Sequence, residues 1–213
     1  MDPVVSLFSI LGALILGAIS PGPSFLFVTR TAVAVSRRDG IAAAVGMGLG
    51  ATVVSILAML GVRAVLAQVE WLYIGFKMVG GFYLLYLGWR LWRGASVPAP
   101  VLAEYASQPA AGRRRSFLLA LATQFSNPKT LIVISGIFAA LLPSRVPTWM
   151  YLSIPPAHLI IETSWYTFVA LAMSSTAPRL VYLRAKANID RAAGCVLGVL
   201  GLRLIFAGAK EVG

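Results

Sequence analysis

Ser20-Pro21-Gly22-Pro23 interrupts the first long apolar stretch of this chain, which covers residues 4–28. Each proline lacks a backbone N–H, and its ring clashes with the carbonyl one helical turn back, so a helix cannot continue undisturbed through the motif. Lipid offers no hydrogen bonds to the backbone groups that such a break frees. Broken backbone therefore persists in a membrane only where protein or a watery cavity covers it. The motif predicts a broken membrane helix that borders a polar site.

Five further stretches are comparably apolar. They cover residues 41–66, 71–92, 117–142, 149–173 and 192–209. A helix needs about 20 apolar residues to cross a bilayer, so each stretch is long enough. Charged residues make up 12% of the chain, whereas soluble domains carry about 25%. The sequence therefore predicts an all-α polytopic membrane protein, with six transmembrane helices in a single transmembrane domain over residues 1–213.

Basic residues are concentrated in three of the connections. Most of the 18 Lys and Arg residues fall in or beside residues 29–40, 93–116 and 174–191. Cytoplasmic loops carry an excess of Lys and Arg, so these segments are expected in the cytoplasm and both termini outside. The net charge of +11 is then explained by topology and by contact with anionic lipid headgroups. No nucleic-acid partner is expected, because no basic and aromatic surface stands apart from the apolar stretches.

The first stretch admits one other topology. If its break made it re-entrant, the N-terminus would lie inside and five full crossings would remain. Its N-terminal flank lacks the basic region of a signal peptide, so the stretch is expected to be retained rather than cleaved.

A second proline motif, Asn127-Pro128, lies in the fourth stretch, which is the first helix of the second half of the chain. Each half has three helices, an odd number, so a repeated half would lie upside down in the membrane. The sequence predicts two inverted three-helix repeats, about 1–95 and about 117–213, with broken first and fourth helices. Broken helices in matching positions are the best sequence indication of a transport site near the membrane midplane. The favoured interpretation is a secondary transporter that works by alternating access.

The expected substrate-binding residues surround the two breaks. They are Ser20, Pro21, Gly22, Pro23, Ser24, Gln124, Asn127, Pro128 and Lys129. Free N–H groups at the helix start after Pro23 suit a carboxylate, and freed carbonyls suit an ammonium or a cation. The alternative is a structural kink that a neighbouring helix satisfies. Lys129 lies too deep to reach the headgroups, so it faces a cavity or takes part in a structural ion pair.

Glu162 is the only acid expected deep within an apolar stretch, and His158, the sole histidine, lies one helical turn before it. A buried carboxylate beside an imidazole can relay protons, so both residues are assigned to ion coupling. The alternative is a permanent ion pair of Glu162 with Lys129, Lys77 or Arg203.

Enzymatic motifs are absent. The chain has no Walker A loop, no HExxH helix and no GxSxG elbow, and a lone Cys195 cannot form a dithiol pair. No enzyme activity and no resident metal is expected. A metal-ion exporter and a passive solute channel or membrane scaffold remain as alternatives, although one histidine and one deep acid make a poor ligand set for metals.

Small residues form two stripes at helical spacing. One comprises Ala42, Gly46 and Gly50, and the other comprises Gly194 and Gly198. Such patterns let membrane helices approach closely, so packing within the chain is expected and a homodimer contact is the alternative.

The chain resembles the lysine/threonine exporter (LysE/RhtB) amino-acid efflux family over nearly its whole length. The stretches that carry the resemblance are GAISPGP at 17–23, RRDG at 37–40, AAAVG at 42–46, GGFYLLYLGW at 80–89, FSNPK at 125–129 and GVLGLRL at 198–204. The combination of the two proline motifs is more specific than either motif alone. One departure stands at Ser24, where many members have Asp or Asn.

The resemblance implies a multi-pass protein of the bacterial inner membrane. Such proteins export amino acids or related small solutes, driven by ion or proton gradients as in an antiporter, and they carry no prosthetic group. The broken-helix motifs of the family fall on Pro21, Gly22, Pro23, Asn127 and Pro128 of this chain.

Overall fold

The structure is a computed structural model that describes residues 2–20, 22–68, 70–95, 112–143 and 145–209. All regular structure in these residues is helical, as the sequence predicts. The helices are α1 (Pro3–Ile19), α2 (Pro23–Ala34), α3 (Arg37–Gln68), α4 (Glu70–Gly94), α5 (Arg113–Phe125), α6 (Pro128–Leu141), α7 (Thr148–Met173) and α8 (Thr176–Ala209). Pro21 and the side chain of Lys77, both named above, lie outside the described parts.

Both proline motifs break their helices. Between α1 and α2 the axis bends by 53°, and between α5 and α6 it bends by 57°. Pro23 and Pro128 each occupy the first turn of the helix that follows, where a missing N–H costs nothing. The prediction that the first and fourth apolar stretches are broken is therefore confirmed.

Two unbroken helical segments of the described chain are long and apolar enough to cross a membrane. They are Arg37–Gly61 in α3 and Ala187–Ala209 in α8. The bent pairs α1–α2 and α5–α6 pass the same test when each pair counts as one span, which brings the number to 4. The stretches expected at 71–92 and 149–173 form α4 and α7, which are not among the segments that pass this test in the described residues. The six crossings therefore stay a prediction.

The connections are shorter than expected, and the difference is largest before the last helix. The segment 174–191 was expected as a loop, but α8 already begins at Thr176. Arg and Lys lower the hydropathy of this segment, yet both are good helix formers, so the helix extends beyond its apolar part. The segment expected as a loop at 29–40 likewise contains the end of α2 and the start of α3.

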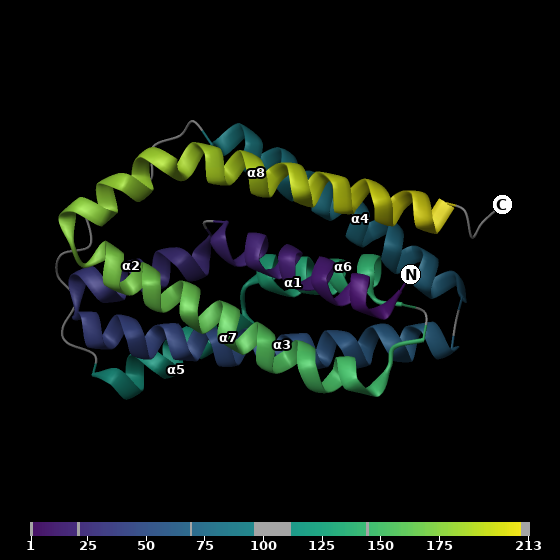
Figure 1. Cartoon of the computed structure of the whole chain (residues 1–213), viewed down its shortest axis with the longest axis horizontal. Helices are drawn as coiled ribbons and strands as arrows, with labels where there is room; N and C mark the ends of the chain where they lie inside the picture. Colours follow the sequence, from purple (N-terminus) through teal and green to yellow (C-terminus); the bar gives the residue numbers. More distant parts are fainter. Residues whose placement is uncertain (1, 21, 69, 96–111, 144, 210–213) are drawn as a thin grey trace.

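The helices form a bundle in which α1 and α6 lie between the α4–α8 pair and a group of α3, α5 and α7 (Figure 1). The small-residue stripes face helices of the same chain. A Cβ on Gly46 would lie 3.0 Å from the Cβ of Ala120, and a Cβ on Gly88 would lie 2.6 Å from the carbonyl oxygen of Gly194. The packing interpretation is confirmed for Gly46 and Gly194, whereas a homodimer remains a prediction.

Candidate functional site

The polar motifs lie between two apolar clusters of the bundle. One cluster contains Ile10 and Leu14 of α1, the later part of α6 and the start of α7. The other contains Phe25 and Val28 of α2 and the later part of α7. Each broken pair passes from one cluster to the other, and so does α7. The two breaks and the middle of α7 are therefore at a similar depth, in a polar layer inside the bundle.

Hydrogen bonds join the two breaks directly. Lys129 Nζ donates to the backbone oxygen of Ser20 at 2.7 Å and to Ser20 Oγ at 3.0 Å. Asn127 Nδ2 donates to Ser24 Oγ at 2.9 Å, and Ser24 Oγ donates to Gln124 Oε1 at 2.5 Å. The residues expected at the two breaks are thus brought together, although 100 to 109 positions separate the bonded pairs in the sequence.

The side chain of Lys129 lies directly across Gly22. A Cβ built on Gly22 would be 3.1 Å from Lys129 Cδ and 3.3 Å from Nζ, closer than ordinary van der Waals contact. The φ angle of Gly22 is −166°, an extended conformation open to any residue. The close approach of the lysine, and not the backbone conformation, therefore favours glycine at this position.

The starts of the two half-helices differ in their capping. Asn127 caps α6, because its side-chain oxygen accepts from the backbone N–H of Lys129 at 3.0 Å. No side chain caps α2, whose N-cap is Gly22. Backbone N–H groups at an uncapped helix start carry partial positive charge and favour an anion.

α7 supplies a second polar group opposite the breaks. His158 Nε2 lies 3.5 Å from Glu162 Oε1, and His158 Nδ1 lies 2.5 Å from Ser55 Oγ of α3. Glu162 Oε2 is buried and has no hydrogen-bond partner in the described part of the chain. The Lys129 ammonium is hydrogen-bonded to Ser20 and makes no direct contact with Glu162. The charges of Lys129 and Glu162 therefore interact only at longer range.

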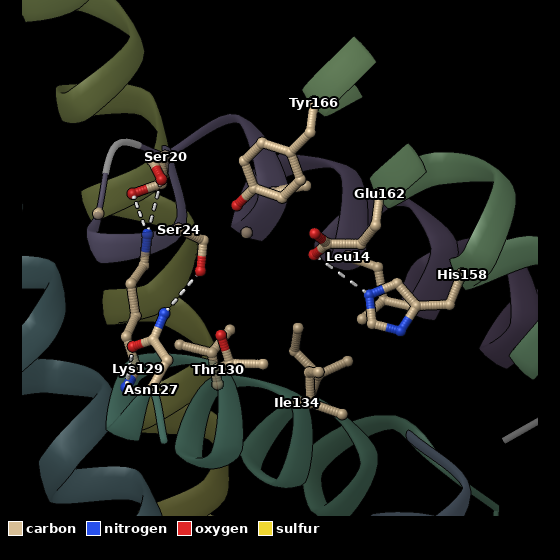
Figure 2. Close-up of a pocket in the computed structure, with 15 residues that line it drawn as sticks. Leu14, Ser20, Ser24, Asn127, Lys129, Thr130, Ile134, His158, Glu162 and Tyr166 are labelled. Atoms are coloured by element: carbon tan, nitrogen blue, oxygen red, sulfur yellow. Dashed lines mark hydrogen bonds and ion pairs between the residues drawn. The ribbon is translucent and has the colours of Figure 1, made fainter. Parts of the chain in front are cut away.

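The two polar groups line one cavity between the broken pairs and α7 (Figure 2). Among the predicted site residues, those that line it are Ser20, Gly22, Ser24, Asn127, Lys129, His158 and Glu162. Pro23 and Pro128 are not among the lining residues, but they begin the helices α2 and α6 that border the cavity. Gln124 contributes indirectly, because its Oε1 accepts a hydrogen bond from Ser24. The cavity leaves ≈ 30 Å³ for the centres of water-sized spheres, enough for about two water molecules.

Sequence reasoning missed several polar residues here. Tyr166 and Thr130 line the cavity, and Tyr166 follows Glu162 by one helical turn, a spacing that was available in the sequence. Asp190 is only 3% exposed and interacts electrostatically with Lys129, so Glu162 is not the only deeply buried acid. Asp190 was assigned to a loop because the helical start of α8 was not predicted.

A helical bundle with apolar segments, two broken helices and a polar cavity between them is typical of membrane transport proteins. The sequence profile of the LysE type translocator family matches residues 15–208. The chain therefore belongs to this family, as the resemblance predicted, and it is a transporter rather than an enzyme.

Several curated proteins are similar to the chain over nearly its full length. The threonine efflux protein of Escherichia coli K12 is 33% identical over 193 residues, which cover 90% of this chain and 93% of that protein. The threonine efflux protein of Salmonella typhi is 31% identical over 192 residues, with the same coverage of 90% and 93%. An uncharacterized membrane protein of E. coli K12, YahN, is 30% identical over 212 residues, 99% of this chain and 94% of that protein. No solved structure matches the chain.

Proposed function

We propose that the chain is a secondary transporter that exports amino acids or related small solutes across the bacterial inner membrane. The single observation that carries the proposal is the cavity between two adjacent broken helices, with a lysine on one side and a carboxylate on the other (Figure 2). Family membership and the similarity to proteins named for threonine efflux favour an amino acid as the solute.

The charges of the cavity match the two charged groups of a free amino acid. The ammonium of Lys129 has three donors, and Ser20 takes two of them. The third donor and the uncapped start of α2 are available to the substrate carboxylate. On the far side, the unpartnered Oε2 of Glu162 is available to the substrate ammonium or to a coupling proton.

The size of the cavity supports alternating access. Space for about two water molecules is too small for an amino acid, so the helices must separate to admit one. The contacts that would yield are side-chain hydrogen bonds between the breaks, such as those of Lys129 to Ser20 and of Asn127 to Ser24. These bonds can exchange for bonds to the substrate.

We further propose six crossings in two inverted repeats, with both termini outside. Bends of 53° and 57° are less than a right angle, which favours two broken spans over re-entrant loops that double back. In Figure 1 the start of α1 and the end of α8 lie at the same end of the bundle, as an even number of crossings requires. The pairs α1–α2 and α5–α6 run in opposite directions along it, which supports the inversion.

The two alternatives make different predictions. A metal-ion exporter needs several ligands together, and the described residues contain no group of three His, Cys, Asp or Glu side chains that could hold a metal. A passive channel needs no charged pair that changes partners. Neither alternative has a specific observation in its favour.

The experiment is transport by the purified protein in liposomes with an imposed pH gradient. Labelled threonine and a panel of neutral, acidic and basic amino acids are tested for saturable flux. We expect flux of at least one amino acid that depends on the gradient, and a loss of about tenfold or more in Lys129→Ala, the cost of about one charge-assisted hydrogen bond. The matched control, Arg145→Gln, removes an exposed charge in a connection and should leave flux unchanged. Flux that is unsaturable, or that is seen only with divalent metals, would overturn the proposal.

A further inference from the structure

Ser55 is a buried hydroxyl that makes its contact with the sole histidine of the chain. It lies in α3, within an apolar stretch, and is 0% exposed. Its Oγ lies 2.5 Å from His158 Nδ1, a short hydrogen bond. His158 is itself only 1% exposed, so water does not compete for Nδ1.

The two nitrogens of His158 therefore face different partners. Nδ1 faces the Ser55 hydroxyl, and Nε2 faces the Glu162 carboxylate at 3.5 Å. A neutral imidazole carries its proton on one nitrogen only, and the hydrogen bond at one nitrogen sets the state of the other. When the Ser55 hydroxyl donates to Nδ1, the proton of the imidazole must be on Nε2, directed at Glu162.

We infer that Ser55 is a positioning residue of the ion-coupling site. It holds His158 in the Nε2–H form, so that the imidazole donates to Oε1 of the ionised Glu162. Oε2 then remains as the carboxylate oxygen that takes up and releases the coupling proton or the substrate ammonium. The inference rests on the proposed function for its coupling role, but the hydrogen-bond arrangement stands apart from it.

No described side chain of α3 lines the cavity, so Ser55 acts through His158 rather than on the substrate. The other titratable or charged side chains that line it, among the described residues, are Lys129 of α6 and Tyr166 of α7. The helices α1 and α2 also pack against α7, but they contribute no charged side chain to the lining of the cavity. The proton moves only on Glu162: it binds Oε2 from the cavity and leaves by the same oxygen, while the proton on Nε2 stays in place.

Without the hydroxyl, only the 3.5 Å contact with Glu162 favours the Nε2–H form of the imidazole. In Ser55→Ala the form with its proton on Nδ1 becomes accessible, and its unprotonated Nε2 then faces the carboxylate. Two unprotonated acceptors then face each other, which disturbs the carboxylate that the coupling step uses. We expect this disturbance to move the pH profile of export by about half to one pH unit.

The first test is nitrogen NMR of the full chain in lipid, labelled with ¹⁵N-histidine and purified through a tag that contains no histidine. The chain has a single histidine, so the two ring signals need no assignment. We expect the Nε2–H form in the wild type and in Ser55→Thr, which keeps the hydroxyl, and a substantial Nδ1–H population in Ser55→Ala. The control Thr52→Ala removes a hydroxyl that bonds to Gly48 O on the same helix, and it should match the wild type.

The second test is the pH profile of amino-acid export in liposomes. We expect Ser55→Ala to move the profile by about half to one pH unit, and Ser55→Thr to restore it. A wild-type histidine protonated on Nδ1 when neutral, or the same ring form in Ser55→Ala as in the wild type, would overturn the inference. If the pH profile of Ser55→Ala matched that of the wild type, the role of Ser55 in coupling would be overturned. If the wild type shows no flux at all, the proposed function fails, and the NMR result still decides the inference.

Discussion

Substituting Gly22 with alanine tests whether the position of Lys129 controls transport. The added methyl group would lie 3.1 Å from Lys129 Cδ and 3.3 Å from Nζ, so the lysine must move by a few tenths of an ångström. That movement strains the bonds of 2.7 and 3.0 Å to Ser20. If it costs roughly a third of two charge-assisted hydrogen bonds, each worth about 1.5–3 kcal/mol, the loss is about 1–2 kcal/mol.

The assay is substrate flux in liposomes, expressed as maximal rate over half-saturating concentration. A loss of about 1–2 kcal/mol lowers this ratio by about 5- to 30-fold. The matched control is Gly12→Ala in α1, where a Cβ meets nothing within 4 Å, and it should have no effect.

A double-mutant cycle makes the prediction specific. The three atoms nearest to the new methyl group all belong to Lys129, so Gly22→Ala should have almost no effect in a Lys129→Ala background. Binding of a labelled substrate extends the comparison to variants with slow flux. Additive effects of the two substitutions would refute the argument, because Gly22→Ala would then act on something other than the lysine.

Three further outcomes follow from the packing and the topology. Gly88→Ala places a Cβ 2.6 Å from a backbone oxygen of α8, so it should destabilise the protein by about 1–3 kcal/mol in thermal unfolding in detergent. Gly198→Ala adds a Cβ that meets nothing within 4 Å, so it should leave the stability unchanged. Equal destabilisation by the two substitutions would contradict the packing argument. Asn127→Ala removes the cap of α6 and the bond to α2, and an unchanged unfolding midpoint would contradict the expected loss of about 1–2 kcal/mol. In a cysteine-free background, an impermeant thiol reagent added to intact cells should label Arg145→Cys and leave Arg38→Cys unlabelled; labelling of both would exclude six crossings.

The helix breaks could be predicted from the sequence because proline acts locally. Pro23 and Pro128 prevent a continuous helix whatever surrounds them. Their partners could not be predicted in the same way. Lys129 lies beside a cavity, one of the two surroundings expected for it, but its hydrogen-bond partner is the backbone oxygen of Ser20, 109 positions away, which only the tertiary structure brings near.

Ser55 and Asp190 illustrate two other limits on what a sequence indicates. A serine in an apolar helix is unremarkable, because its hydroxyl can bond to its own helix. Its contact with His158 spans 103 positions and depends on how α3 packs against α7. Asp190 was missed because hydropathy reports where a helix is apolar, and α8 begins well before its apolar part.

The contact between α4 and α8 has a consequence for measuring motion. Gly81 lies against Gly201 and Gly88 against Gly194, and in each pair the backbone of one helix touches the other with no side chain between. Such close backbone contact leaves the two helices little room to slide past each other, so we expect them to travel together through a transport cycle. Spectroscopic labels placed on the outer faces of α4 and α8 would keep a constant separation. The α4–α8 pair would then serve as a fixed reference for measuring the displacement of the other helices.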